Sequence, residues 1–367
     1  MPVPAVNLKP CLDSTEPAWR AHLDDLFARS HFILGHHVRT LEQELSAAFQ
    51  AKHAITVGNG TAAIELCLRD SGITKPSQEV ITTALTAPFT GVAIATPGCR
   101  IRFADVDPDT LLLDPTDAAN RATKRTAAIV PVHLYGQPVP LAPFRKLVRE
   151  RKAVLIQDAC QAHGAQHNGK PLTAYGPYVC YSFYPTKNLG CLGDGGAIMT
   201  NSPAIAKRLL SRRDGGRRGG QIAYLPGINS RLDEMQACYL RAFLPHLDDW
   251  NNMRRRTAAL YEEGLRDCPG VTLLRTSPES VRHLFVIRAQ RRDRLRHHLT
   301  AQGIGTGIHY PAPLHLMPAF RDAGLRRGDL PHAERATKEI LSLPIYPYLP
   351  ESSAHEVIER VRAFYVR

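Results

Sequence analysis

The chain has 367 residues, of which 44% are hydrophobic and 22% are charged, as in an ordinary globular protein. Its 46 lysines and arginines outnumber its 34 aspartates and glutamates, so the formal net charge is +12. A chain of this length buries a large core without disulfides or metals, so the composition excludes a disordered tail, a fibrous repeat and a small disulfide scaffold.

The first part of the chain alternates between predicted strands and helices. Apolar residues at helical spacing predict a helix within 16–50, and a short β-like run follows over 54–57. A glycine-rich turn at 58–61 then leads into a helix over 62–69, whose free N-terminal amides suit a phosphate. Further strands are expected over 79–83, 100–105, 127–132, 153–158, 179–183 and 197–200, with helices over 91–95 and 141–151.

This alternation predicts an α/β fold with a large domain over residues 1–245, built on a mostly parallel mixed sheet flanked by helices. After about residue 240 the pattern changes, and a smaller C-terminal α+β domain is expected over 246–367. Ligands of parallel sheets bind at the carboxyl ends of the strands, so polar residues at these ends are the candidates for function. In the C-terminal part, helices are expected over 240–265, 291–302, 333–341 and 354–365, and strands over 271–274 and 284–287.

The stretch 181–196 is the most informative, because Lys187 follows a predicted strand and precedes a glycine-rich turn. A lysine held in such a place can have a lowered pKa and can form a Schiff base with an aldehyde. Pyridoxal phosphate is the common aldehyde cofactor, and it requires such a lysine, an acid facing its ring nitrogen, a phosphate cradle and a stacking partner. Taken alone, a lysine such as Lys187 is far more typical of a surface loop.

The remaining parts of such a site are present in the order required. Asp158 ends an apolar strand, where a buried carboxylate needs a cation such as a protonated pyridine ring, although it could instead cap the next turn. Gln161 could donate to the phenolic oxygen of the cofactor. His163 is a candidate substrate residue, although a lone histidine is more often structural. The turn before 62–69 supplies the phosphate cradle.

Together these motifs resemble the DegT/DnrJ/EryC1/StrS family of sugar aminotransferases, which are pyridoxal-phosphate enzymes of the aspartate-aminotransferase-like, type I fold. The order of several separate motifs argues against chance. The matching stretches run nearly end to end and are 32–35, 60–63, 103–107, 131–136, 158–164, 182–190, 227–237, 303–311 and 343–347.

The resemblance implies a role for each matching residue. Lys187 would be the Schiff-base lysine and the proton shuttle, Asp158 would hold the pyridinium nitrogen, and Gln161 would lie near the phenolic oxygen. Asn229 would reach the phosphate from a neighbouring subunit, which implies a homodimer with shared sites. The resemblance also assigns phosphate binding to Gly60, Thr61 and Ser182, and substrate contacts to His309 and Tyr310.

Two stretches depart from the family pattern. The family usually carries a stacking aromatic directly after a threonine, whereas here the residues from Thr86 to Thr90 place the aromatic two positions later, at Phe89. Phe89 is therefore the candidate for stacking on the cofactor, and its alternative is a place in the core. Asp214 precedes Gly215 where many relatives carry a histidine, so substrate recognition is expected to differ there.

The predicted reaction is a transamination in two halves. An amino donor, glutamate by resemblance, aminates the cofactor to pyridoxamine phosphate, which then aminates a keto-sugar carried on a nucleotide. A keto-cyclitol aminotransferase is the main alternative. A sugar dehydratase is disfavoured because such enzymes typically carry histidine at the position of Lys187, and a desulfurase would need a mobile cysteine such as Cys191. A non-catalytic regulatory protein on the same fold would use its basic charge to bind nucleic acid.

Charge and cysteine usage bear on partners and compartment. The arginine-rich runs at 212–218, 254–256 and 288–296 are not interleaved with aromatics, so they indicate a solvated face or attraction of an anionic substrate rather than nucleic-acid binding. The eight cysteines are scattered and form no C-x-x-C pair, which favours reduced thiols without a metal site. No apolar run of membrane-spanning length and no secretory signal is recognised, so we expect a cytoplasmic protein without a membrane partner.

Overall fold

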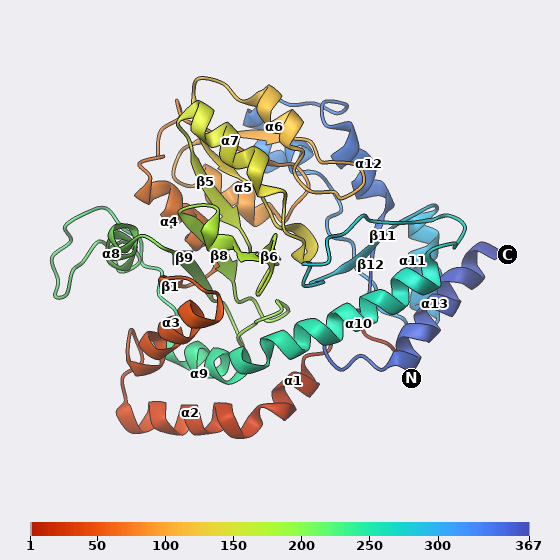
Figure 1. The fold of residues 1–367 in the computed structure, drawn as a ribbon, viewed down its shortest axis with the longest axis horizontal. Helices are drawn as coiled ribbons and strands as arrows, with labels where there is room; N and C mark the ends of the chain where they lie inside the picture. The colour runs from red at the N-terminus through yellow and green to blue at the C-terminus, as the bar shows by residue number, and fades with distance from the viewer. Residues whose placement is uncertain (1, 367) are drawn as a thin grey trace.

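A computed structural model describes residues 2–366 and is built around a seven-stranded sheet (Figure 1). The strand order is β1-β9-β8-β5-β4-β2-β3, in which β9 runs antiparallel to both its neighbours and the other pairs are parallel. The mostly parallel mixed sheet predicted from the sequence is therefore confirmed. Its strands are β1 (His53–Val57), β2 (Glu79–Thr83), β3 (Arg100–Ala104), β4 (Thr126–Val130), β5 (Val154–Asp158), β8 (Tyr178–Ser182) and β9 (Gly196–Thr200).

Helices flank this sheet; α4 packs on β8, and α7 packs on β4 and β5. The helices are α1 (Lys9–Ser14), α2 (Glu16–Arg29), α3 (His36–Ala48), α4 (Gly60–Asp70), α5 (Pro88–Ala95), α6 (Pro115–Arg121), α7 (Leu141–Arg151), α8 (Pro203–Arg212), α9 (Glu234–Phe243), α10 (Leu247–Leu265), α11 (Arg292–Ala301), α12 (Pro331–Glu339) and α13 (Glu351–Val366). Five 3-10 helices are η1 (Leu134–Gly136), η2 (Leu172–Ala174), η3 (Leu244–His246), η4 (Leu314–Leu316) and η5 (Pro318–Ala323).

Three predicted helices are corrected by the structure. The helical segment 16–50 is interrupted between α2 and α3, where Ser30 and Leu34 adopt left-handed backbone conformations with φ of 49° and 53°. The helix predicted over 240–265 divides at η3, which contains Pro245, because proline lacks the N–H that a continuous helix needs. The helix predicted over 333–341 ends at Glu339, and the apolar residues that follow form a strand.

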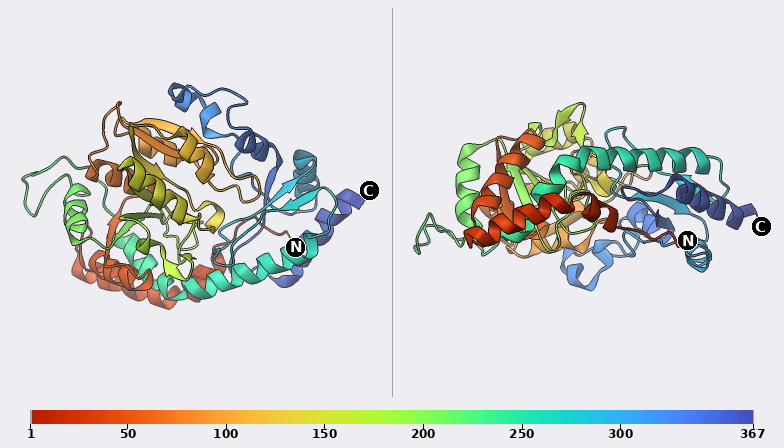
Figure 2. Two further views of the ribbon diagram at one scale, coloured as in Figure 1. Left: turned by 45° about the horizontal axis from the view of Figure 1, so that its top comes forward. Right: turned by 90° about the horizontal axis from the view of Figure 1, so that it is seen from below.

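A second, three-stranded antiparallel sheet lies in the C-terminal part of the chain, with its own hydrophobic core. The long helix α10 serves both cores, because Trp250 packs in the larger one and Tyr261 in the smaller one. Figure 2 shows α10 running along the molecule from one core to the other. The strands are β10 (Val271–Leu273), β11 (Phe285–Ala289) and β12 (Ile340–Leu343), and a separate hairpin joins β6 (Gln166–His167) to β7 (Lys170–Pro171).

The division into residues 1–245 and 246–367 stays a prediction. Residues from the C-terminal part also pack into the larger core, among them Leu314, Phe320 and Leu330. The aromatic ring of Phe320 packs edge-on against Phe103 of β3 at 5.7 Å between ring centroids. The two cores are therefore tied together by more than the shared helix α10.

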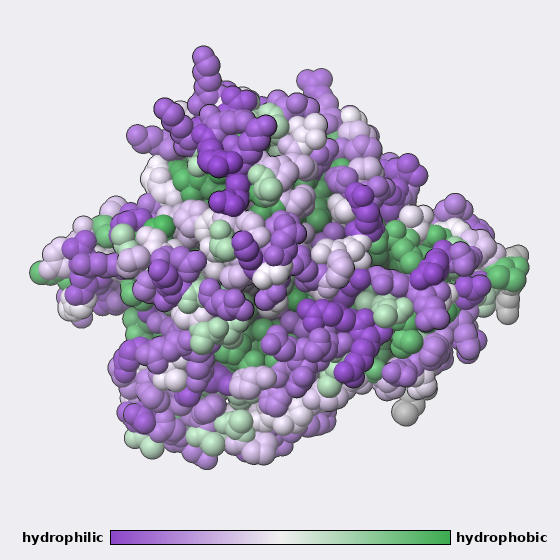
Figure 3. Space-filling model, viewed as in Figure 1, coloured by the Kyte–Doolittle hydropathy of each residue, from purple (hydrophilic) through white to green (hydrophobic). Residues whose placement is uncertain are grey.

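The surface is mostly polar on the face seen in Figure 3, with separate apolar patches between the hydrophilic residues. Within residues 2–366 no helix combines the length and the apolar character needed to span a membrane.

Candidate active site

The loop after β8 holds Lys187 in a tight, partly buried turn. The backbone N–H of Lys187 donates to the carbonyl of Tyr184 at 2.8 Å. A side chain at Gly190 would overlap the Pro185 carbonyl, so this close approach requires glycine. Desolvation lowers the pKa of the Lys187 amine below its ordinary value, although the neighbouring Cys160 and the carboxylate of Asp158 oppose this shift. An amine with a lowered pKa is a better nucleophile near neutral pH.

Asp158 is buried at the carboxyl end of β5, with 4% of its surface exposed. Its Oδ2 accepts a hydrogen bond from Oγ1 of Thr90 at 2.8 Å, and its Oδ1 accepts one from the backbone N–H of Cys160 at 3.1 Å. Within residues 2–366 no cationic side chain forms an ion pair with it. A buried carboxylate without a cation is unfavourable, so this position suits a positively charged ligand group.

The first turn of α4 lies against the end of β8. The side chain of Asn59 accepts from the N–H of Ala62 at 2.8 Å and so caps the helix. A Cβ on Gly60 would come within 2.8 Å of the Ser182 Cβ and 2.7 Å of the Cys160 Sγ, so only glycine allows this contact. The predicted phosphate residues Gly60 and Ser182 are therefore adjacent, and Thr61 follows directly on the same helix N-terminus, which is suited to an anion.

Gln161 connects two segments that are far apart in the chain. Its Oε1 accepts from the backbone N–H of Tyr135 at 2.7 Å, and its Nε2 donates to the hydroxyl of Tyr310 at 3.0 Å. Because Oε1 must face the Tyr135 N–H, the orientation of the amide is determined. One N–H of Nε2 then remains for a ligand oxygen.

The predicted substrate residues His309 and Tyr310 lie beside this group. Nδ1 of His309 is 2.8 Å from the hydroxyl of Ser342, and desolvation and the positive charge of Lys187 lower the pKa of this histidine. Desolvation and the charge of Asp158 raise the pKa of Tyr310, so it stays a neutral hydroxyl. The hydrogen bond from Gln161 to Tyr310, the effect of the Lys187 charge on His309 and the effect of the Asp158 charge on Tyr310 indicate that these residues lie near one another.

His163 is buried behind this site. Its Nε2 lies 2.8 Å from the backbone carbonyl of Ser182, and its own carbonyl accepts from Nδ2 of Asn251 at 2.9 Å. Desolvation, together with the charge of Lys187, lowers the pKa of His163 to about 3. In this structure it contacts the backbone of a predicted phosphate residue, and its contact with substrate stays a prediction.

Phe89 and Asn229 are exposed in this single chain. Phe89 lies in the first turn of α5 and is 65% exposed, directly before the Thr90 that donates to Asp158. Asn229 pairs with Asp214 at the base of a long loop that follows α8 and projects from the body of the protein (Figure 1). The next residue, Ser230, accepts from the N–H of Gly58 at 3.0 Å, so the base of the loop adjoins the turn before α4.

Several residues of the site were missed by the sequence analysis. Thr90 and Cys160 contact Asp158, Tyr135 contacts Gln161, and Ser342 contacts His309. Thr90 directly follows the candidate Phe89 in the sequence, and this position next to a predicted site residue is a signal that could have identified it. Ser342 and Tyr135 lie in separate stretches of the chain, and no local pattern marks their partners.

The chain is similar in sequence and in structure to several known proteins. The chain is 42% identical over 370 residues to the "Pleiotropic regulatory protein" of Geobacillus stearothermophilus, covering 100% of this chain and 99% of the relative. It is 40% identical to the "dTDP-3-amino-3,4,6-trideoxy-alpha-D-glucose transaminase" of Streptomyces venezuelae, covering 98% and 95% of the two chains. The crystal structure of S. venezuelae DesV "in complex with ketimine intermediate" superimposes with a TM-score of 0.97 at 40% identity, covering 100% and 99%.

This structural match over the whole chain confirms the predicted α/β fold class, with its mostly parallel mixed sheet and its smaller C-terminal sheet. The chain belongs to the DegT/DnrJ/EryC1/StrS aminotransferase family, whose family model matches residues 15–362. The family resemblance inferred from the sequence motifs is therefore confirmed.

Proposed function

We propose that the protein is a pyridoxal-phosphate-dependent aminotransferase that moves an amino group from an amino acid, such as glutamate, to a nucleotide-linked keto-sugar. The observation that carries this proposal is the buried carboxylate of Asp158, which has no cationic partner in the described chain and acts electrostatically on the partly buried amine of Lys187. The transaminase name of the Streptomyces venezuelae relative supports a nucleotide-linked sugar as the acceptor.

The residues present fit this cofactor. When bound, pyridoxal phosphate supplies an aldehyde carbon and a ring that accepts electrons. Asp158 pairs with the protonated ring nitrogen, which provides the cation that its buried carboxylate lacks. Gln161 donates its remaining N–H to the phenolic oxygen. The cradle of Gly60, Thr61 and Ser182 holds the phosphate, because the close approach of α4 to β8 leaves helix N–H groups facing an anion.

Lys187 has two tasks in this proposal. Its amine would hold the cofactor covalently, and its Nζ would take up and return a proton. Both tasks need an amine that exchanges its proton near neutral pH, and desolvation lowers the pKa of Lys187 in that direction. Tyr310 keeps its hydroxyl proton and can donate it to a substrate oxygen, because its own lone pair accepts from Gln161.

We also propose a homodimer in which Asn229 binds the phosphate of the partner's site. An exposed apolar patch lies next to the loop that carries Lys187. Phe32 is 47% exposed, Ile33 40%, Leu192 41% and Met235 44%. Their segments are in contact, because Ile33 pairs with Asp233 and the Leu192 N–H donates to the Gln236 side chain at 2.9 Å. Exposed apolar residues that gather in this way are typical of a protein interface.

The eight free cysteines favour a reducing compartment, and we propose the cytoplasm. A non-catalytic regulatory role is the second candidate, because one relative of 42% identity is named a regulatory protein. The presence of both Lys187 and Asp158 in one site favours the enzyme, since a regulatory scaffold would require neither.

The experiment that tests the function combines absorbance with turnover. Purified protein is loaded with pyridoxal phosphate, dialysed and scanned for the absorption band of lysine-bound cofactor. The proposal predicts that the wild type and Lys146→Ala, a change on the exposed face of α7, keep the band, whereas Lys187→Ala loses it. A panel of keto-sugars and keto-cyclitols with glutamate is then assayed by formation of 2-oxoglutarate. A protein that takes up no cofactor contradicts the proposal, and salt-dependent DNA binding without amino transfer favours the regulatory candidate.

A further inference from the structure

Tyr135 lies where the large sheet meets the 309–310 segment. It is part of η1, after the carboxyl end of β4, with 6% of its surface exposed. Its φ of 58° is unusual for a non-glycine residue and turns the backbone N–H toward Gln161. The side-chain hydroxyl of Tyr135 donates to a different partner, the backbone carbonyl of His309.

These contacts form a closed ring of hydrogen bonds. The backbone N–H of Tyr135 donates to Gln161 at 2.7 Å, Gln161 donates to the Tyr310 hydroxyl at 3.0 Å, and the Tyr135 hydroxyl returns to the carbonyl of His309. Tyr135 therefore contacts both Gln161, which is proposed to face the cofactor, and the 309–310 segment, which carries the proposed substrate residues. The ring spans 174 positions of the chain between Tyr135 and His309.

Besides the bond from Gln161 to Tyr310, the other hydrogen bonds of this stretch lie at its flanks and on the His309 side chain. The side chain of His309 contacts Ser342, and the neighbouring N–H groups of Gly307 and Leu314 donate to the carbonyls of Ser342 and Ala84 at 3.1 and 2.8 Å. The Tyr135 hydroxyl contacts the His309 carbonyl between these two anchors. Without this donor, the partly buried carbonyl loses its partner, and the segment is free to move relative to Gln161.

We propose that Tyr135 is a positioning residue for the acceptor substrate. It holds Tyr310 beside the cofactor, so that the hydroxyl proton of Tyr310 faces the keto-sugar. This inference rests on the proposed function for the identity of the substrate. Its structural part, the restraint of the 309–310 segment by one hydroxyl, is independent of any reaction.

The test removes that hydroxyl alone. Tyr135→Phe is compared with Tyr261→Phe, which deletes a buried hydroxyl that donates to the carbonyl of Pro344 at 2.9 Å in the smaller core. Hydrogen exchange of the loaded holoenzyme is followed by mass spectrometry on peptides covering 305–316. We expect exchange of the Gly307 and Leu314 amides to accelerate about threefold or more in Tyr135→Phe and to stay at the wild-type rate in Tyr261→Phe. Unchanged exchange in Tyr135→Phe, or equal acceleration in both variants, overturns the restraint.

Steady-state kinetics test the substrate part. We expect Tyr135→Phe to raise the KM for the keto-sugar about tenfold, with the KM for the amino donor and the cofactor absorbance unchanged. In a Tyr310→Phe background the same change is expected to raise that KM less than about twofold, because the positioned hydroxyl is already absent. Equal increases in both backgrounds overturn the role through Tyr310. If the wild type aminates no keto-sugar, the proposed function fails, while the exchange experiment still decides whether Tyr135 restrains the segment.

Discussion

At the scale of single residues, the site depends on how Asp158 is held. Its carboxylate accepts two hydrogen bonds, and the donor from a side chain is Thr90 at 2.8 Å. Hydrogen bonds to ionised groups are stronger than neutral ones, because the acceptor carries a full charge. Thr90 therefore orients the oxygen atoms of Asp158.

Thr90→Val keeps the shape of the side chain but removes its hydroxyl. We expect this variant to retain pyridoxal phosphate roughly 10- to 150-fold less tightly than the wild type, because loss of a hydrogen bond to a charged group costs about 1.5–3 kcal/mol. Equilibrium dialysis followed by absorbance measures this affinity. The control is Thr257→Val on α10, whose hydroxyl donates only to the backbone carbonyl of Met253. Equal affinities in the Thr90 variant and the wild type would show that Asp158 needs no side-chain donor.

His133 supplies a pH-dependent contribution to stability. It is fully buried, its Nδ1 accepts from the N–H of Val139 at 3.1 Å, and desolvation lowers its pKa to about 3. The unfolded chain, with a histidine pKa near 6.5, binds the proton first, so stability is complete above that pH and falls as pH decreases from about 6.5 toward 3. One such histidine contributes up to about 2 kcal/mol of this loss between pH 6.5 and 5.

His133→Asn removes the titrating ring and keeps an acceptor near the position of Nδ1. We expect its free energy of unfolding to change less between pH 7.5 and 5 than that of the wild type, measured by urea titration at each pH. His355→Asn on the exposed face of α13 serves as the control and should keep the wild-type slope. A His133→Asn slope equal to that of the wild type would refute the contribution.

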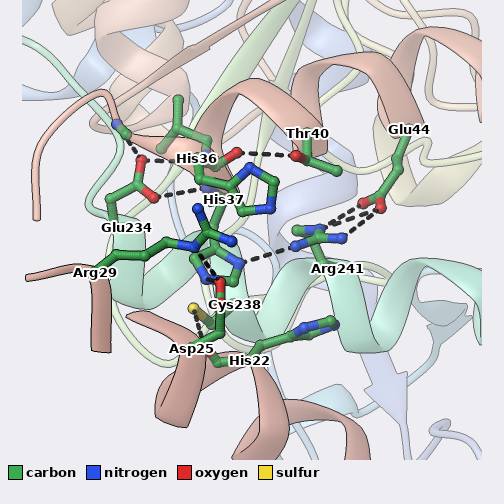
Figure 4. A network of polar contacts seen from close by, with 12 residues as sticks. His22, Asp25, Arg29, His36, His37, Thr40, Glu44, Glu234, Cys238 and Arg241 are labelled. Atoms are coloured by element: carbon green, nitrogen blue, oxygen red, sulfur yellow. Dashed lines mark hydrogen bonds and ion pairs between the residues drawn. The ribbon is translucent and has the colours of Figure 1, made fainter. Parts of the chain in front are cut away.

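At the scale of elements, the start of α3 depends on a side chain from α9. The carboxylate of Glu234 is fully buried and accepts from the N–H groups of Gly35, His37 and Val38 at 2.5, 2.8 and 3.1 Å (Figure 4). Gly35 has no side chain to cap the helix itself, so the cap comes from a residue about 200 positions later. The negative charge also favours the positive end of the helix dipole.

Removing this cap is expected to destabilise the fold. Glu234→Ala leaves three buried N–H groups without an acceptor, and we expect it to lower the free energy of unfolding by about 2–3 kcal/mol, whereas Glu234→Gln should cost less. Urea unfolding measures both variants. Glu16→Ala, which alters an exposed pair at the start of α2, should stay within about 0.5 kcal/mol of the wild type. Equal stability of Glu234→Ala and Glu16→Ala would contradict the capping role.

At the scale of the whole molecule, the exposed apolar patch of Phe32, Ile33, Leu192 and Met235 bears on assembly. A charge placed there would have to be buried if two chains meet at this patch, and burial of an unpaired charge is costly. Met235→Asp is therefore expected to shift the protein from dimer to monomer, measured by size-exclusion chromatography with light scattering.

The control for this prediction is Val6→Asp, which places the same charge on another exposed apolar residue, 40% exposed near the N-terminus. We expect Val6→Asp to keep the mass of the wild type. A wild-type protein with the mass of one chain would contradict the homodimer, and a dimeric Met235→Asp would place the interface elsewhere.

By itself, the sequence determined the fold class and the seven strands of the larger sheet, because strand alternation and glycine turns are local patterns. It also placed Asp158 and Ser182 at strand ends and Gly60 at a helix N-terminus, as the structure has them. The roles assigned to these residues, and to Asn229 and Phe89, stay predictions.

Only the tertiary structure decided which distant groups meet. Thr90 and Asp158 lie 68 positions apart, and Tyr135 and His309 lie 174 apart, so no local pattern joins them. The break at Pro245, by contrast, has a local cause, because proline lacks the N–H that a continuous helix needs. Periodicity reports which face of an element is buried, whereas the partner on that face depends on how all the elements pack together.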